Sequence, residues 1–133
     1  MHRSNVAANA IVDISRFSYS ETIDKLTAAI GAAGATLFAQ IDQSAAAEGA
    51  GLTLRPTTLL IYGNPKAGTL LMQAFPLTAL DLPLKLLIWE ESGTVRVAHL
   101  PVKALVSRYD VTGEAQLVDA FEHAVDALLN QIR

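Results

Sequence analysis

Short runs of β-branched and apolar residues, some alternating with polar ones, are typical of strands. Such runs predict strands at residues 10–17, 36–41, 57–62, 84–90 and 94–100. Ser92 and Gly93 separate the last two runs, and a two-residue loop that ends in glycine predicts a β-hairpin.

Apolar residues spaced three and four apart predict three helices. The first begins with Ser20 as its N-cap, and the second covers Thr69–Phe75. The third begins at Glu114 and has one apolar face, formed by Leu117, Phe121, Val125, Leu128 and Ile132. The glycine-rich stretch after Asp42 is predicted to form a short helical turn at most.

The hairpin loop predicts the pairing of the strands on either side of it. If Ser92 and Gly93 form the loop, Glu91 pairs with Thr94 and Trp89 lies across from Arg96. One face of the pair then carries Leu86, Ile88, Val95, Val97 and His99. The other carries Lys85, Leu87, Trp89, Arg96 and Ala98.

Strands and helices do not alternate throughout the chain, because the hairpin interrupts the alternation. We therefore expect an α+β fold: a two-layer sandwich with an antiparallel or mixed sheet and helices packed on one face. Residues 1–9 are expected to be a flexible tail, and residues 10–133 a single domain. The sheet face without helices is a candidate interface or ligand platform, with Lys85, Leu87, Trp89 and Arg96 as its candidate residues, and Arg96 could stack on Trp89.

Composition narrows the function classes. Of the 133 residues, 51% are hydrophobic and only 17% are charged, which favours self-association. The net charge of -3 argues against a nucleic-acid partner. We expect neither a signal peptide nor a membrane span, because no apolar run approaches the required length. We therefore expect a cytoplasmic protein. Disulfides are excluded because the chain has no cysteine.

The segment IYGNPKAGTLLM (residues 61–72) joins a predicted strand to a predicted helix. Gly63 and Gly68 have the spacing of a phosphate-binding P-loop, but Thr69 stands where that motif requires lysine. Two interpretations remain: a tight turn, or a site for a small anion at the helix N-terminus. The second would use Gly63, Asn64, Lys66, Gly68 and Thr69.

Three further residues are candidates for ligand binding. His99 is expected on the inner sheet face, either as a partly buried structural side chain or as a ligand contact. Asp42 and Tyr62 each lie near the end of a predicted strand, so both are expected at one rim of the sheet. No second histidine lies near His99 in the sequence, so we expect neither a metal site nor a cofactor. No nucleophile motif is present either.

Three segments carry a resemblance to a known family: YSETIDKLTAAIGAAGATLFAQID, IYGNPKAGTLLM and LDLPLKLLIWEESGTVRVAHLP. They are similar to the domain-of-unknown-function family 302, over most of residues 18–101. The resemblance implies a small α+β fold in bacteria and archaea, with homodimers and no established activity. The positions that match its motif are Gly63, Asn64, Pro65, Gly68, Leu80, Asp81, Leu82 and Pro83. Family members often carry Asp-His after the second strand; here the pair is Asp42-Gln43, so no role of that histidine transfers.

Three hypotheses for the function follow. The first is a homodimeric module that binds a ligand or a protein without catalysis. The second is an enzyme that acts on a small anionic molecule at the Gly63–Thr69 loop, and the third is a purely structural protein. The second hypothesis requires Asp42, this loop and His99 to line one pocket.

Overall fold

The computed structural model describes residues 9–133 and contains one five-stranded sheet in the order β1-β5-β4-β3-β2. Residues 1–8, which include His2 and most of the predicted tail, lie outside the described residues. The strands are β1 (Ile11–Ile14), β2 (Thr36–Asp42), β3 (Thr57–Gly63), β4 (Leu84–Glu91) and β5 (Thr94–His99). Each neighbouring pair is antiparallel.

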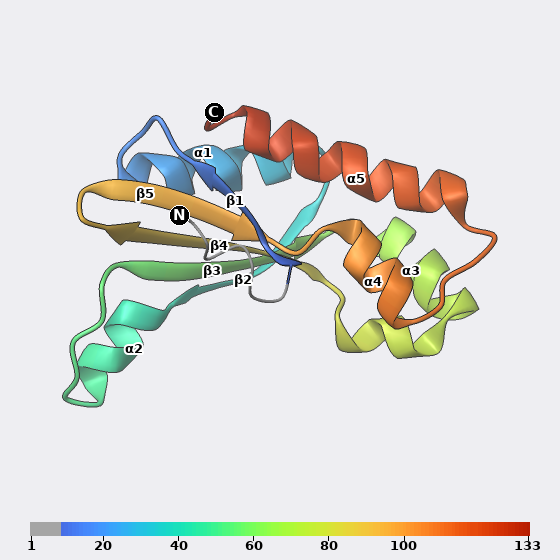
Figure 1. The fold of residues 1–133 in the computed structure, drawn as a ribbon, viewed down its shortest axis with the longest axis horizontal. Helices are drawn as coiled ribbons and strands as arrows, with labels where there is room; N and C mark the ends of the chain where they lie inside the picture. Colours follow the sequence, from blue (N-terminus) through green and yellow to red (C-terminus); the bar gives the residue numbers. More distant parts are fainter. Residues whose placement is uncertain (1–8) are drawn as a thin grey trace.

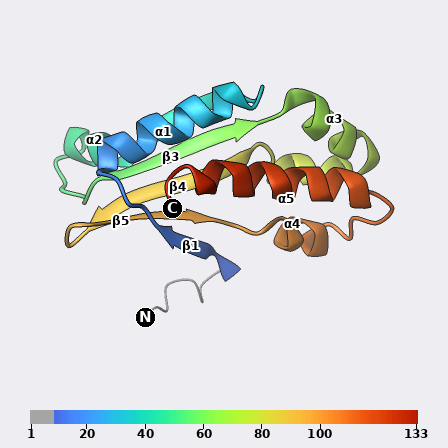
Figure 2. The ribbon, with the colours of Figure 1, turned by 90° about the horizontal axis from the view of Figure 1, so that it is seen from above.

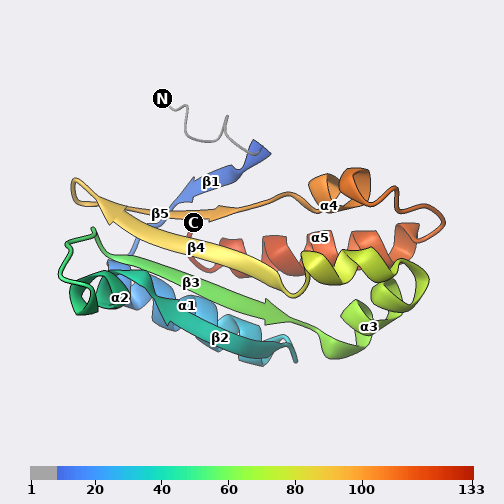
Figure 3. The same ribbon diagram turned by 90° about the horizontal axis from the view of Figure 1, so that it is seen from below.

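The helices lie on one face of this sheet and at its two ends. They are α1 (Tyr19–Ala32), α2 (Gln43–Gly49), α3 (Pro65–Ala74), the 3-10 helix η2 (Pro76–Leu80), α4 (Val102–Arg108) and α5 (Ala115–Asn130). Helices α1 and α5 lie side by side over one face (Figures 1 and 2), and the opposite face is open (Figure 3). The two-layer α+β prediction is therefore confirmed.

The main core lies between the sheet and helices α1 and α5. Alternate residues of β3, β4 and β5 point into it because side chains along a strand alternate between faces. Its fully buried members include Leu26, Ile30, Leu60, Leu86, Ile88, Val97, Leu129 and Ile132. A smaller cluster joins α3, α4 and the first half of α5 through Leu71, Val102, Leu105, Val111 and Phe121.

The predicted hairpin register is confirmed. Glu91 pairs with Thr94 and Trp89 with Arg96. The predicted stacking of Arg96 on Trp89 is not found: the cation–π contacts of the described residues are those of Arg16 and Lys25 with the Phe17 ring.

Several helix boundaries differ from the predictions. Helix α1 starts two residues early, because Ser18 and Glu21 form a reciprocal capping box and Ser18, not Ser20, is the N-cap. Helix α3 begins at Pro65 rather than Thr69, because the Asn64 side chain caps it. Helix α2 is a full helix rather than a turn, with Asp42 as its N-cap. Helix α4 was not predicted.

Candidate functional site

Asp42 and Tyr62 lie at opposite ends of the sheet, so the prediction that they share a rim is wrong. Strands β2 and β3 are antiparallel, and Asp42 pairs with Thr58 whereas Tyr62 pairs with Leu37. The Asp42 carboxylate is exposed and accepts hydrogen bonds from the Ser44 hydroxyl at 2.7 Å and the Ala45 amide at 2.9 Å. These bonds lower the pKa of Asp42. The carboxylate therefore acts as a helix cap in this structure.

The loop after β3 uses its own backbone donors. Asn64 Oδ1 accepts from the amides of Lys66 at 3.0 Å and Ala67 at 3.2 Å. The Gly68 amide donates to the Asn64 carbonyl at 2.9 Å, and Pro65 has no amide hydrogen. The first turn of α3 is thus internally capped. An anion at this loop would have to displace the Asn64 side chain.

Four of the candidate residues nevertheless gather at one hollow, which we call the loop cavity. Its volume is about 160 Å³. It is lined by Phe38, Gly63, Asn64, Pro65, Gly68, Thr69, Met72, Leu82, Pro83, Leu84 and Phe121. Lys66 is exposed and is not part of this lining. The lining is almost entirely apolar and contains no ionisable side chain.

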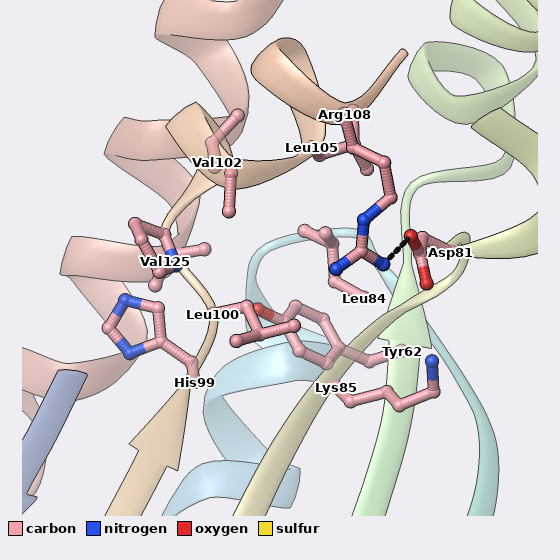
Figure 4. Close-up of a pocket in the computed structure, with 12 residues that line it drawn as sticks. Tyr62, Asp81, Leu84, Lys85, His99, Leu100, Val102, Leu105, Arg108 and Val125 are labelled. Atoms are coloured by element: carbon pink, nitrogen blue, oxygen red, sulfur yellow. Dashed lines mark hydrogen bonds and ion pairs between the residues drawn. The ribbon is translucent and has the colours of Figure 1, made fainter. Parts of the chain in front are cut away.

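Tyr62 and His99 line a different hollow, of about 70 Å³, which we call the tyrosine cavity (Figure 4). Strands β3 and β5 are both antiparallel to β4 and therefore parallel to each other, so their C-terminal residues meet at the same end of the sheet. Helix α4 covers this end and contributes Arg108. The remaining lining residues are Asp81, Leu84, Lys85, Leu100, Pro101, Val102, Ala104, Leu105 and Val125.

Two polar atoms in the tyrosine cavity's lining residues have no hydrogen-bond partner. The Tyr62 hydroxyl is buried, with the residue only 3% exposed, and burial strongly raises its pKa. His99 Nδ1 is also buried without a partner. Burial is the largest influence on His99 and lowers its pKa, against a smaller opposing effect of Asp13. Both side chains are therefore mainly neutral at pH 7, and unpaired buried polar groups of this kind are costly.

An ion pair lies at the rim of the tyrosine cavity. Asp81 Oδ2 accepts hydrogen bonds from Arg108 Nη1 at 2.6 Å and from the Tyr109 hydroxyl at 2.7 Å. The Tyr109 bond has the largest effect on the pKa of Asp81 and lowers it. Burial, second in size, raises the pKa, but the bond and charge of Arg108 lower it again, so the net shift is downward. Lys85 is a second cation in the lining, so two cations face one carboxylate. The rim carries a net positive charge.

Asp81 and Arg108 line the tyrosine cavity but were not predicted as site residues from the sequence. Arg108 was not identified because it belongs to α4, which was not predicted. The sequence does contain a signal for this helix, since apolar residues with helical spacing follow Pro101: Val102, Leu105, Val106 and Tyr109. Asp81 lies 27 residues from Arg108, and nothing local indicates their contact. Lys85 was predicted as an interface residue rather than as part of a cavity.

The predicted interface residues lie on the open sheet face. Leu87, Trp89 and Arg96 are partly buried there although no helix covers them (Figure 3). Arg96 Nη1 lies 3.8 Å from a Glu91 carboxylate oxygen, too far for a hydrogen bond, and this atom is buried without a partner. Within residues 9–133, no group of three or more histidine, aspartate or glutamate side chains could hold a metal ion.

A family model described as "Domain of unknown function DUF302" matches residues 11–132. The chain belongs to this family. A crystal structure of an uncharacterised DUF302 protein from Bacillus stearothermophilus has the same fold, with a TM-score of 0.85. The two are 21% identical, and the match covers 93% of this chain and 98% of that one.

Curated relatives of this DUF302 chain are much longer. The chain is 46% identical over 82 residues to proteins named "Fluoride-specific ion channel FluC 1" from Brucella suis biovar 1 and Brucella abortus biovar 1. These matches cover 61% of this chain and 32% and 30% of the two relatives, so the matched segment spans about a third of their length. Among the described residues, no helix is long and apolar enough to cross a membrane.

Proposed function

We propose that this DUF302 protein is a non-catalytic, homodimeric module that binds a small anionic ligand in the tyrosine cavity. The observation that carries the proposal is the buried, unpartnered hydroxyl of Tyr62, a residue that lines this hollow. A ligand oxygen could accept the hydroxyl proton. Such a ligand would satisfy a group that is otherwise costly to bury.

The charge and size of the cavity support a small anion. Arg108 and Lys85 outnumber Asp81 in the lining, so the surrounding charge favours a negative ligand. A volume of about 70 Å³ corresponds to roughly two water molecules at the ~30 Å³ that each occupies in the liquid. Formate and acetate are of this size. The apolar walls favour the ligand that carries a methyl group.

Binding is better supported than catalysis. The enzyme hypothesis required Asp42, the Gly63–Thr69 loop and His99 at one pocket. Asp42 is at the other end of the sheet, and the loop and His99 line separate cavities. Asp42 therefore cannot act with His99 as a general acid–base pair.

The name of the Brucella relatives adds one specific anion to those worth testing. Those proteins are named for fluoride, and fluoride is small enough for the tyrosine cavity. Transport itself is not part of the proposal, because the chain matches only about a third of each relative. We propose fluoride as a ligand to be compared directly with formate, acetate and phosphate.

The experiment is a thermal melt of the purified protein with each of these anions at pH 6 and pH 8. A ligand at 100 times its Kd should stabilise the fold by about 2.7 kcal/mol, and this increase should be much smaller in Tyr62→Phe. Tyr19→Phe is the matched control, because the Tyr19 hydroxyl is bonded to Thr58 outside both cavities. No response to any anion, or equal responses in wild type and Tyr62→Phe, would refute the proposal.

We propose the open sheet face, with Leu87, Trp89 and Arg96, as the homodimer interface. Its partly buried apolar residues and the unpartnered Arg96 Nη1 support a second copy that supplies an acceptor. Analytical ultracentrifugation should give a dimer for wild type and a monomer for Leu87→Glu. A monomeric wild type would contradict this part alone. The cytoplasmic location stays a prediction that cell fractionation can check.

A further inference from the structure

Two glycines line the loop cavity at positions where the backbone does not require glycine. Gly63 is the last residue of β3, and Gly68 lies inside α3. Neither has a positive φ, unlike Gly34, Gly51, Gly93 and Gly113. Glycine destabilises a helix interior relative to alanine and is depleted in strands. The benefit of these two glycines must therefore lie elsewhere.

What both glycines supply is open space inside the loop cavity. A Cβ at Gly63 would lie 3.5 Å from the Pro83 Cβ and 3.9 Å from the Phe38 ring, and one at Gly68 would lie 3.9 Å from the Met72 methyl. All three neighbours line the cavity. A longer side chain at either position would start at the cavity wall. Two independent departures from local preference at one hollow are expected at a functional site.

The chemistry of the cavity selects its ligand. The walls consist mainly of Phe38, Met72, Leu82, Pro83, Leu84 and Phe121, and no ionisable side chain is among the lining residues. The amides of Lys66, Ala67 and Gly68 are already bonded to Asn64. A charged ligand would lose its hydration without compensation. A neutral apolar molecule would not.

We propose that the loop cavity binds a small neutral molecule with an apolar ring of about the size of benzene. Its volume of about 160 Å³ is close to that of an engineered apolar cavity of about 150 Å³ that binds benzene. The cavity is distinct from the tyrosine cavity, although Leu84 lines both. This site goes beyond the proposed anion-binding function, because it takes an uncharged ligand and uses neither Tyr62 nor His99.

The test uses fluorobenzene as the probe. Its fluorine NMR signal is recorded in the presence of the protein. Wild type should broaden the fluorine signal, and amide signals of Gly63, Gly68 and Thr69 should shift on titration. Gly63→Val should fill the cavity and reduce the broadening at least tenfold at equal protein concentration. Gly49→Ala is the matched control, since its added Cβ meets nothing within 4 Å and its φ is not positive. It should bind as wild type does.

A second variant, Gly68→Leu, keeps the proposal testable if Gly63→Val does not fold. Gly68→Leu enters the same cavity from α3, and circular dichroism establishes that each variant is folded before binding is compared. Unbroadened fluorobenzene with wild type would overturn the proposal. So would full binding by a folded Gly63→Val or Gly68→Leu.

Gly68→Ala should raise the Tm by about 3–5 °C, because alanine is the better helix former. A lowered Tm would show that this glycine serves the fold instead.

Discussion

The two cavities share Leu84 but differ in how the chain builds them. The loop cavity is formed mainly by residues close in sequence, from the end of β3 through α3 and from residues 82–84. The tyrosine cavity combines residues of β3, β4, β5, α4 and α5 with Asp81, which precedes β4. The loop cavity is apolar, and the backbone amides of Lys66, Ala67 and Gly68 beside it are already bonded to Asn64. The tyrosine cavity is lined by residues with unpartnered polar atoms and has a charged rim. A conspicuous sequence motif thus marks the apolar cavity, and the polar one has no local signature.

Leu84 lines both cavities, so its substitution is expected to have the largest effect. Leu84→Ala should lower the free energy of unfolding by about 2 kcal/mol, because Leu84 is partly buried and packs on both apolar clusters. It should also join the two cavities. Urea denaturation measures the loss, with the exposed Leu80→Ala as control, expected within about 0.5 kcal/mol of wild type. Equal effects of the two substitutions would mean that Leu84 does not hold the cavities apart.

The charged rim belongs to the tyrosine cavity alone. Asp81→Asn should destabilise the protein by about 1 kcal/mol at pH 7, after allowance for solvent screening of the Arg108 pair. The pKa of Asp81 is lowered in the folded state, so its contribution is present above pH 4 and is lost as the pH falls below about 3.8. Denaturation from pH 3 to pH 7 should show a flatter profile for Asp81→Asn. A profile of Asp81→Asn that runs parallel to that of wild type would contradict this.

The tyrosine cavity differs from the loop cavity in having the buried, unpartnered hydroxyl of Tyr62 among its lining residues. Tyr62→Phe should raise the free energy of unfolding by about 1 kcal/mol in the absence of a ligand, because it removes a buried group without a partner. Tyr109→Phe should change stability in the opposite direction, since the Tyr109 hydroxyl donates to Asp81. Chemical denaturation of both variants in one buffer provides the measurement. Destabilisation by Tyr62→Phe would indicate that the hydroxyl is bonded in solution.

The smallest expected effect concerns His99. Burial lowers its folded pKa below the ordinary 6.5, so its contribution to stability is complete above about pH 6.5 and is lost as the pH falls. Asp13, Asp126 and Arg133 are the charged groups that act on it. The Tm of wild type should fall more between pH 7 and pH 5 than that of His99→Gln. A pH profile of the Tm that is the same for wild type and His99→Gln would refute the assignment.

Much of the fold could be predicted from local patterns. All five strands, the hairpin register and the apolar face of α5 depend on the alternation or helical spacing of nearby residues, which the sequence displays directly. The missed features have other causes. The capping-box spacing of Ser18 and Glu21, which Ser20 lacks, was overlooked. The short helix α4 has only about two turns of pattern, which is too little to separate it from a loop.

The sequence by itself determined the family, the α+β class, the two sheet faces and four of the residues that line the loop cavity, because these depend on short-range periodicity and on one motif. Only the tertiary structure decided that Asp42 and Tyr62 lie apart and that His99, Asp81 and Arg108 meet at one cavity. The reason is strand direction. Whether two strand ends meet depends on which strands pair and in which orientation, and a linear pattern does not contain that information.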